Sequence, residues 1–449
     1  MNRPSFNAAR FGLTPREWRF GLVISSVHGI QHVFYRLFPP LIPILAVGMD
    51  ASLWELGLLV SVFLFAGGLG QAPMGILVDR YDRGFVLIPA IVLLSIGYLV
   101  FVLGSAIGMF LPSISLLGHT FSGTYQLMAC GMFVAGVGYS AIHPVGYPLI
   151  SANVDAENKA TVLGMWGSAS KVGDTIAPLL IALFILVIPW EWILIGVSLC
   201  GFLYAGWLFV LLQRGTIETQ PPARTSGATA PTDSHGSRGP RTFLVPITTI
   251  LVAFCCVLFA TNGLITFAPV FVTDVYGYSL SVAGLEVPPA SVANVYFSAL
   301  LISGAVSQLI VGAIANRYDY RFVLLGLLAA TTLGLVVLAT LQLTPLALLA
   351  VFVIVGGCLF GLNPVRDALI SDLTPAAYEG RIFGSFWTVV LLVSSGYPLF
   401  IGYLGDTVGV QASFGFLAAG TVLGMAVIGL LYSPRIYRQR TTSTDAPAD

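Results

Sequence analysis

The chain is short of charge: only 9% of its 449 residues are Asp, Glu, Lys or Arg, whereas about a quarter are charged in a typical soluble domain. This scarcity, together with a mean hydropathy of +0.90, excludes an ordinary soluble protein. Basic and acidic residues balance at 20 each, so the chain has no basic domain, and we expect no nucleic-acid partner.

The chain also lacks the usual marks of an enzyme. It has no phosphate-binding glycine loop, no ligand cluster with metal-site spacing and no nucleophile elbow, so we expect neither catalysis nor a cofactor. Its five cysteines all lie in apolar stretches, where small buried side chains explain them better than disulfides or metal ligands.

Long apolar runs are what the sequence has instead. Twelve blocks are each about 20 residues or more, the length that crosses ~30 Å of hydrocarbon as a helix. The blocks lie near residues 20–46, 56–78, 84–108, 123–150, 158–188, 191–213, 243–275, 291–316, 322–342, 346–371, 379–405 and 409–433. Backbone groups in lipid must be satisfied internally, and the alternating segments of ~10 residues that build barrels are absent. The sequence therefore predicts an all-α polytopic membrane protein with twelve transmembrane helices.

Basic residues gather on one side of this predicted topology. If the first helix starts inside, 17 of the 20 Lys and Arg fall in cytoplasmic segments, and the other three lie within apolar blocks. This is the positive-inside rule, which predicts a multi-pass protein of the plasma (inner) membrane with both termini in the cytoplasm. Residues 1–19 are polar and the first block is too long for the apolar core of a signal peptide, so no cleavable signal is expected.

The two halves of the chain repeat one another. GILVDRYDRGFVL from Gly75 resembles GAIANRYDYRFVL from Gly312, and HPVGYPLIS from His143 resembles NPVRDALIS from Asn363. The most polar internal segment, rich in Pro, Gly, Ser and Thr, is typical of a flexible linker. We therefore expect an N-terminal six-helix bundle (1–213), a cytoplasmic linker (214–242), a C-terminal six-helix bundle (243–433) and a cytoplasmic tail (434–449). Parallel repeats of this kind are a transporter architecture with the substrate site between the halves.

Polar side chains in the first apolar block are costly in lipid and indicate a functional path. Three of them recur every four residues and share one helix face, and the full set is His28, Gln31, His32, Tyr35 and Arg36. At 1.5 Å per residue, His32 lies about 18 Å from the cytoplasmic end, near the midplane. Pro39 and Pro40 remove backbone donors and should kink the helix. We expect this face to line an aqueous cavity.

The fifth block carries Lys171 and Asp174, three residues apart. One interpretation is that they neutralise each other within the helix. The other is that they take part in substrate binding or proton coupling, and the sequence leaves both open.

The loop from Gly75 resembles the signature of the major facilitator superfamily, Gly-x-Leu-x-Asp-Arg-x-Gly-Arg-x-x-x-Leu. It matches at Gly75, Leu77, Asp79, Arg80, Arg83 and Leu87, with Asp82 where the family has glycine. The resemblance implies two six-helix bundles in a lipid bilayer that carry a small-molecule substrate by alternating access. We expect a conformational gate at Gly75, Asp79, Arg80, Arg83, Gly312, Asn316 and Arg317. Gly75 would let two helices approach closely. Asp79 would bond the amides of a facing helix or pair with an arginine. The alternative is that the loop charges only anchor the topology.

In the family, helices one, four, seven and ten line the cavity. With the charges of the fifth helix, the resulting candidates are His28, Gln31, His32, Tyr35, Arg36, His143, Lys171, Asp174, Asn262, Asn363, Arg366 and Asp367. His143 and Asn363 each precede a proline and alternatively support a kink. The embedded set holds three positive groups and two carboxylates, which favours an anionic or polar substrate. Histidines exchange protons near neutral pH, which favours a proton gradient as the energy source.

The direction of transport has one indication in the sequence. Gly164-x8-Gly173-x3-Ala177-Pro178 resembles the antiporter signature of the fifth helix, although Ala177 stands where the family has glycine. GYSAIHPVGYP and HGIQHVFYRLFPPLIP are similar to exporters of the fosmidomycin-resistance type. The sequence thus favours a monomeric, proton-coupled exporter of a small organic solute. The alternatives are an importer of a small carboxylate, anchored by Arg36 and Lys171, and a sensor that keeps the fold without transport.

Overall fold

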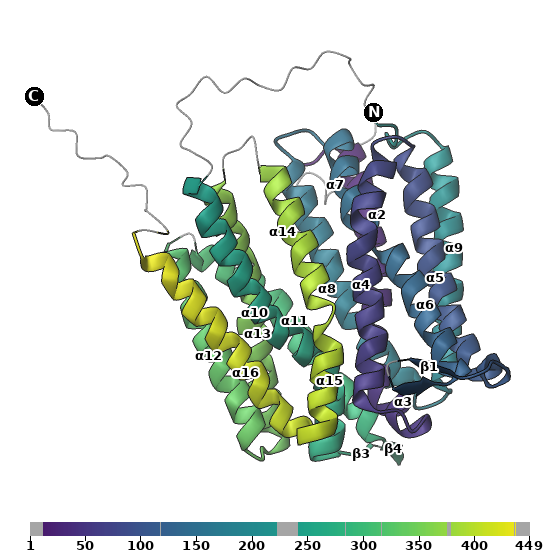
Figure 1. Cartoon of the computed structure of the whole chain (residues 1–449). Helices are drawn as coiled ribbons and strands as arrows, with labels where there is room; N and C mark the ends of the chain where they lie inside the picture. The colour runs from purple at the N-terminus through teal and green to yellow at the C-terminus, as the bar shows by residue number, and fades with distance from the viewer. Residues whose placement is uncertain are drawn as a thin grey trace, which may run out of the picture.

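The computed structural model describes residues 12–116, 118–221, 241–282, 284–315, 317–374, 379–434 and 436. Helices dominate it (Figure 1). Among these residues, eleven helical segments are long and apolar enough to cross a membrane. The long helix α8 (Lys159–Phe184) is not one of the eleven, and it carries Lys171 and Asp174 in its middle. With α8 counted, the described part of the chain holds the twelve spanning segments that the sequence predicts.

The first half of the chain begins with α2 (Pro15–Arg36), whose start is fixed by a capping box between Thr14 and Glu17. A short 3-10 turn at Pro39–Leu41 separates it from α3 (Ile42–Gly48), so the break expected at the two prolines is present. The other helices of this half are α4 (Leu53–Val78), α5 (Arg83–Ile107), α6 (Gly123–Tyr139), α7 (Ile142–Asn153), α8 and α9 (Trp190–Gln213). Helix α2 packs along α8, and α5 packs against α6 and α9.

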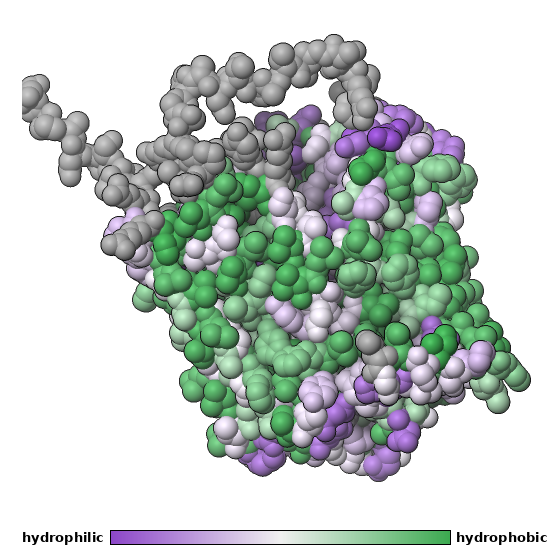
Figure 2. Space-filling view, in the orientation of Figure 1, coloured by the Kyte–Doolittle hydropathy of each residue, from purple (hydrophilic) through white to green (hydrophobic). Residues whose placement is uncertain are grey.

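The second half contains α10 (Arg241–Phe271), a π-helical turn at Val272–Tyr276, α11 (Pro289–Ala315), α12 (Tyr320–Thr340), α13 (Pro345–Leu373), α14 (Glu379–Ser394), α15 (Tyr397–Val408) and α16 (Val410–Gly429). Helices α10 and α12 pack on α16, and α11 packs on α13. Figure 1 shows the helices of the two halves standing side by side. In Figure 2 the middle of the visible face is mainly hydrophobic, and hydrophilic residues gather towards its upper and lower ends.

Two short hairpins mark one end of the molecule. They pair β1 (Ile114–Leu116) with β2 (His119–Phe121) and β3 (Leu280–Val282) with β4 (Leu285–Val287). Each turn contains a glycine in the left-handed region, Gly118 (φ 82°) or Gly284 (φ 81°), where other residues are strained. The sequence analysis did not predict these strands. We call this end the hairpin side, and the opposite end, where α2 begins and α16 finishes, the terminal side (Figure 1).

The two halves meet backbone to backbone on the hairpin side, where α4 lies along α15. A Cβ on Gly57 would collide with the carbonyl oxygen of Pro398, and one on Gly402 would collide with that of Leu53. The backbone amides of Leu53 and of the next residue donate to the Asp406 carboxylate at 2.9 and 2.8 Å. These contacts join the start of one helix to the end of another from the opposite half.

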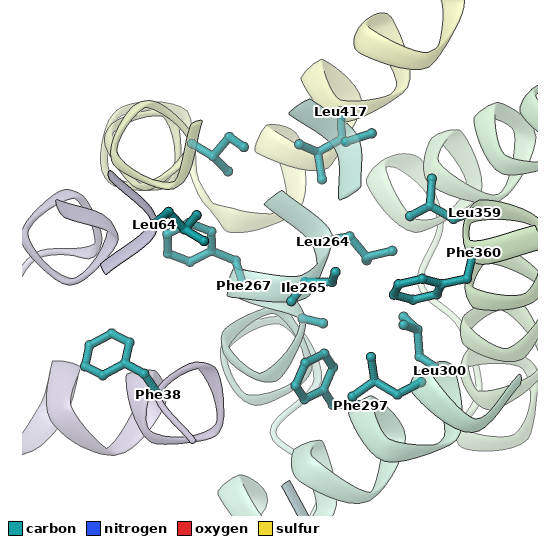
Figure 3. Close-up of a cluster of buried hydrophobic side chains, with 14 of the residues drawn as sticks. Phe38, Leu64, Leu264, Ile265, Phe267, Phe297, Leu300, Leu359, Phe360 and Leu417 are labelled. Atoms are coloured by element: carbon teal, nitrogen blue, oxygen red, sulfur yellow. The ribbon is translucent and has the colours of Figure 1, made fainter. Parts of the chain in front are cut away.

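Apolar side chains of both halves fill the region beside this junction. Phe38 and Leu64 come from the first half, and Ile265, Phe267 and Phe297 come from the second; all belong to one buried cluster (Figure 3). The cluster places a layer of buried apolar side chains between the helices of the two halves.

The start of the predicted linker is attached to the first half, whereas the sequence predicts a flexible segment over 214–242. The Glu218 amide donates to the Asn153 side chain at 2.7 Å, and the Gln220 side chain donates to Asp82 at 2.7 Å. Polar groups at the ends of α5 and α7 thus give this segment partners. Residues 222–240, the remainder of the linker before α10, lie outside the described residues.

Candidate functional site

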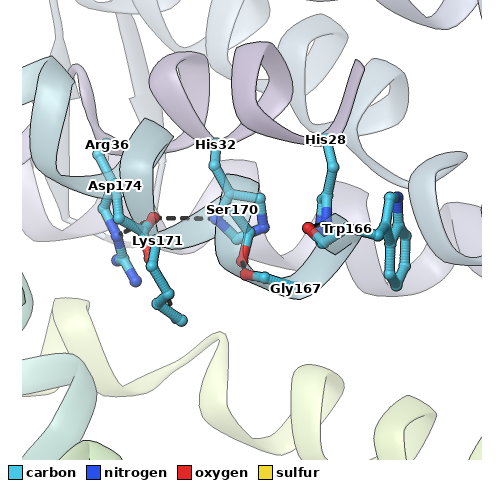
Figure 4. Close-up of polar contacts among 8 residues, drawn as sticks. All are labelled: His28, His32, Arg36, Trp166, Gly167, Ser170, Lys171 and Asp174. Atoms are coloured by element: carbon cyan, nitrogen blue, oxygen red, sulfur yellow. Dashed lines mark hydrogen bonds and ion pairs between the residues drawn. The ribbon is translucent and has the colours of Figure 1, made fainter. Parts of the chain in front are cut away.

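Asp174 of α8 is a buried carboxylate that meets three basic side chains (Figure 4). Its Oδ1 atom lies 2.9 Å from both His32 Nδ1 and Arg36 Nε. Its Oδ2 atom accepts a hydrogen bond from Lys171 Nζ at 3.2 Å. Asp174 is only 1% exposed, so these partners must offset the large desolvation penalty of a buried charge. Two permanent positive charges face one negative charge, which leaves the cluster positive even when His32 is neutral.

Small residues bring the two helices of this cluster together. A Cβ on Gly173 would collide with the carbonyl oxygen of Gly29, and a Cβ on Gly29 would lie 3.2 Å from the carbonyl oxygen of Ala169. Helices α2 and α8 therefore touch through their backbones, as small residues permit in membranes. The four-residue spacing then points both His32 and Arg36 of α2 at Asp174.

Lys171 and Asp174 form the ion pair that their spacing suggests, but Asp174 is not paired with Lys171 alone. Asp174 also binds two side chains of α2. The Lys171 side chain is 22% exposed, and its ammonium lies 5.2 Å from the ring centre of Phe360 in the second half. Lys171 is therefore the cluster's most accessible cation, and it faces the junction of the halves.

A small cavity lies beside Arg36, between the two halves. Its volume of about 20 Å³ is room for roughly one water molecule. Its polar lining includes Tyr35, Arg36 and Tyr98 from the first half, with Asn262 and Thr266 from the second. The predicted candidates Tyr35, Arg36 and Asn262 are thus brought together. The Arg36 guanidinium lies 4.2 Å from the centre of the Tyr35 ring, a distance at which the ring face attracts a cation.

The predicted histidines form a buried group next to Asp174. The rings of His28 and His32 are 4.6 Å apart between centroids, and those of His28 and His143 are 5.8 Å apart. His28 Nδ1 donates to the carbonyl oxygen of Trp166 at 2.8 Å. Several buried polar atoms here have no hydrogen-bond partner among the described residues: His28 Nε2, both side-chain polar atoms of Gln31, His143 Nδ1 and Trp166 Nε1.

The remaining cavity candidates form a separate cluster in the second half. Arg366 Nε donates to Asp367 at 2.9 Å, and another guanidinium nitrogen donates to Asn363 at 3.1 Å. Arg366 is 2% exposed, and its guanidinium carbon lies 4.7 Å from the Trp387 ring centre. In the described part of the chain, no hydrogen bond joins this cluster to Asp174. The sequence predicted one cavity for all these residues. In this conformation they lie in two groups, and a cavity that they share stays a prediction.

The two prolines that follow candidate residues behave differently. The helix breaks between Tyr139 and Ile142, just before His143 and its proline. In the second half, α13 continues through Asn363 and the following proline to Leu373. A structural role in a helix break therefore fits His143 better than Asn363.

The first copy of the loop motif does not hold the halves together in this conformation. Asp79 and Arg80 are exposed, and the Asp79 side chain makes no hydrogen bond to a described residue. A Cβ on Gly75 would meet nothing within 4 Å. The expectation that Gly75 allows a close helix approach is therefore wrong here, because the close approaches of α4 occur at other positions along it, such as Gly57 and Gly70. The gating role of Asp79 and Arg80 stays a prediction.

Other charges of the two loops fix the helices that follow them. Asp82 accepts a hydrogen bond from the Gly84 amide at 2.8 Å, and Asp319 in the second copy accepts one from the Arg321 amide at 2.8 Å. Both residues are N-caps. Hydrogen bonds from Arg321 also hold the pKa of the Asp319 carboxyl below its usual value. Arg83 is buried and donates to the carbonyl oxygen of Pro148 at 3.2 Å, so it acts within the first half.

The other predicted gate and antiporter-like residues make few contacts that bear on their predicted roles. A Cβ on Gly312 would only reach ordinary contact with a side-chain atom 3.8 Å away, one on Gly164 would meet open space, and Arg317 is exposed. Asn316 lies outside the described residues. Pro178 lies inside α8, which continues through it. Of the three antiporter-like residues, only Gly173 makes a contact that shapes the site.

Sequence reasoning missed two residues of evident importance. Trp166 stacks on His28 with ring centroids 3.9 Å apart, and Asp406 joins the halves. Trp166 lies eight residues before Asp174 on the same helix, so its position near the histidines could have been found once α2 and α8 were known to pack. Nothing in the sequence connects Asp406 with the start of α4.

Comparisons with known proteins identify the fold and its family. The family model described as Major Facilitator Superfamily matches residues 24–394 and 288–448. A probable L-galactonate transporter of Escherichia coli (strain K12) is 25% identical over 380 residues, 80% of this chain and 76% of the relative. The multidrug resistance protein MdtL of Shigella flexneri is 23% identical over 58% of each chain.

Solved structures show the same arrangement at low sequence identity. A bacterial homologue of the human lysosomal transporter Spinster, inward-facing and occupied, superposes with a TM-score of 0.71 at 14% identity, over 95% of this chain and all of the other. The inward-open xylose transporter XylE from E. coli superposes with a TM-score of 0.70 at 13% identity, over 93% and 96% of the two chains.

Proposed function

This chain belongs to the major facilitator superfamily of membrane transporters, and from that premise we propose that it carries a small organic anion together with protons. The observation that carries the proposal is the position of Asp174 between Arg36 and Lys171. One buried carboxylate pairs with two cations that an anionic substrate would also bind, and the net positive charge that remains favours an anion.

Protonation of Asp174 links the proton to the anion. A proton on the carboxylate removes its charge, so Arg36 and Lys171 lose their counter-ion and can bind a substrate carboxylate instead. Conversely, a bound anion leaves no cation to hold Asp174 in its ionised form. Because such coupling is reciprocal, each ligand strengthens the binding of the other. Two ligands that bind together cross together, so the geometry favours symport.

The lining of the site favours a polar, hydroxylated acid. Gln31 is fully buried, its side chain has no hydrogen-bond partner among the residues that the structure describes, and Asn262 and Thr266 line the cavity beside Arg36. These groups suit hydroxyl groups of the substrate, while Arg36 and Lys171 suit its carboxylate. A probable L-galactonate transporter is among the relatives, and galactonate is an acid of this class.

We place the terminal side in the cytoplasm, because 17 of the 20 Lys and Arg follow the positive-inside rule in that orientation. With the proton gradient of a bacterial inner membrane, symport then means uptake. The Gly164–Gly173–Pro178 pattern and the similarity to MdtL favour the second candidate, a proton-coupled exporter. We further propose that the two halves rock against each other around the Asp174 cluster.

The test is transport in proteoliposomes with L-galactonate and gluconate as probes. An interior made alkaline should drive accumulation, a protonophore should abolish it, and Arg36→Gln should eliminate it. Lys159→Gln, at the first turn of α8 and away from Asp174, is the matched control and should transport normally. Accumulation driven only by an acidic interior would support the exporter instead. Normal uptake by Arg36→Gln would refute the site.

A further inference from the structure

Three histidine rings lead away from Asp174 towards the terminal side. His32 bonds to Asp174, His28 lies one turn nearer the start of α2, and His143 lies across on α7. Helix α2 starts and α7 ends on the terminal side, at Pro15 and Asn153. At 1.5 Å per residue, His32 and His28 lie roughly 26 and 20 Å along α2 from Pro15, and His143 lies roughly 15 Å along α7 from Asn153. The rings therefore descend in steps from the buried carboxylate.

Two nitrogen atoms along this row lack a hydrogen-bond partner in the part of the chain that the structure describes. His28 Nε2 and His143 Nδ1 are both buried, and neither has a hydrogen-bond partner among the described residues. A buried polar atom without a partner is destabilising, so its presence needs an explanation. A nitrogen that must pick up and release a proton explains it, because a permanent partner would block the transfer.

We propose that His28 and His143 conduct the proton between the His32–Asp174 pair and the terminal side. The proposal rests on the proton coupling proposed above and identifies its route. His28 Nδ1 keeps its hydrogen, which it donates to the Trp166 carbonyl oxygen. The transferred proton therefore binds to and leaves from Nε2. The resulting imidazolium lies against the indole face of Trp166, with 3.9 Å between ring centroids, and such a face stabilises a cation.

The second step passes the proton to His143. The 5.8 Å between the two ring centroids suits transfer through one bridging water. His143 accepts the proton at Nδ1 and releases the one at Nε2, which leaves the ring neutral with its hydrogen on Nδ1. Before the next cycle, water returns a proton to Nε2 and removes the one on Nδ1, which restores the starting tautomer. His143 stacks near Tyr147 with 5.9 Å between ring centroids, and Tyr147 is 49% exposed. The path thus ends at a side chain that is partly exposed on the surface of the protein.

Charged groups face the row from both ends. Asp174, Lys171 and Arg36 lie at its buried end, and Asp367 of the second half, paired with Arg366, lies near Tyr147 at the other end. The cations at the buried end repel a proton that has left Asp174, whereas the Arg366–Asp367 pair carries no net charge. The field along the row therefore favours movement towards the terminal side once the substrate has left.

The experiment separates proton transfer from substrate movement. His28→Gln and His143→Gln are compared with the wild-type protein in proteoliposomes for uptake driven by a pH gradient and for exchange of labelled against unlabelled L-galactonate at equal pH. In exchange, the protein crosses between its two conformations with substrate bound in both directions, so it does not have to release the proton. We expect gradient-driven uptake to fall by about 100-fold, the usual size of an acid–base contribution, while exchange stays at the wild-type rate. His119→Gln, an exposed histidine of the hairpin side, is the matched control and should leave both unchanged.

Each outcome decides the proposal. Equal loss of uptake and exchange in both variants would place these histidines in the substrate site and overturn the relay, while leaving the proposed function intact. Normal gradient-driven uptake in both variants would also overturn it. A wild-type protein that exchanges the probe but shows no response to a pH gradient would refute proton coupling itself. If His28→Gln does not fold after losing its bond to Trp166, His143→Gln alone carries the test.

Discussion

Removing the carboxylate of Asp174 tests the site most directly, and Asp174→Asn does so with little change of shape. The variant leaves Arg36 buried, 6% exposed, and without a counter-charge. Arg36 cannot lose its own charge, because a guanidinium does not deprotonate in proteins. Lys171 is more exposed and can move towards water. We therefore assign most of the destabilisation to Arg36, at about 3–5 kcal/mol for a broken buried ion pair.

The double variant Asp174→Asn, Arg36→Gln makes the argument quantitative. It removes both charges, so the penalty of the unpaired guanidinium disappears, and the coupling energy of the two sites should be about 2–3 kcal/mol. Thermal unfolding in detergent should show a low midpoint for Asp174→Asn and partial recovery in the double variant. Uptake driven by a pH gradient should be lost in both. Asp174→Asn keeps the cations that bind the anion but has no carboxylate to take up and release the coupled proton, and the double variant also lacks the Arg36 charge.

One result would refute this reasoning. If Asp174→Asn unfolds at the wild-type temperature, or if the destabilisation of the double variant equals the sum of the two single changes, Asp174 and Arg36 do not stabilise each other. Lys159→Gln again serves as the control for loss of a charge from α8 without loss of a buried pair.

Three further predictions address the frame around the site. Gly402→Val should force α15 away from the Leu53 carbonyl oxygen and reduce transport, and thiol labelling of cysteines placed on the hairpin side should rise; unchanged labelling would contradict the contact. Asp406→Ala removes two hydrogen bonds to backbone amides and should destabilise the closed hairpin side by about 1–3 kcal/mol, visible in the same labelling experiment, whereas Asp406→Glu should lose less. Asp82→Ala and Asp319→Ala should each lower stability by about 1 kcal/mol without changing substrate affinity, and an effect on affinity alone would argue against capping.

Spacing along one helix was enough to predict part of the site. The repeat of His28, His32 and Arg36 predicted a shared face, and the structure places all three on the side of α2 that meets α8. The partner of that face could not be predicted in the same way, because Asp174 is 138 residues from Arg36. Spacing within a helix says nothing about which other helix lies beside it.

Contacts between distant backbones were also beyond the sequence. Gly29 and Gly173 are ordinary glycines in a chain that has 49, and only the packed helices show that these two touch. The same holds for Asp406, because only the folded chain shows that its carboxylate reaches the start of α4 in the other half. The motif at Gly75 predicted the family and the fold well, but not the conformation, because a gate forms its contacts in only one of the states it separates.

The glycine-lined seam between α4 and α15 affects the free-energy difference between the conformations in which the two halves are closed and open on the hairpin side. Because main chain meets main chain at Gly57 and Gly402, separating and rejoining these two contacts changes the freedom of few side chains, so they add little to the difference in rotamer entropy between the two states. The energy difference between them can then stay small enough for a single bound solute to reverse it, since a preference of about 3 kcal/mol already shifts a balanced equilibrium more than a hundredfold. A contact between helices built from glycine therefore suits a transporter whose two conformations are interconverted repeatedly by a substrate of modest affinity.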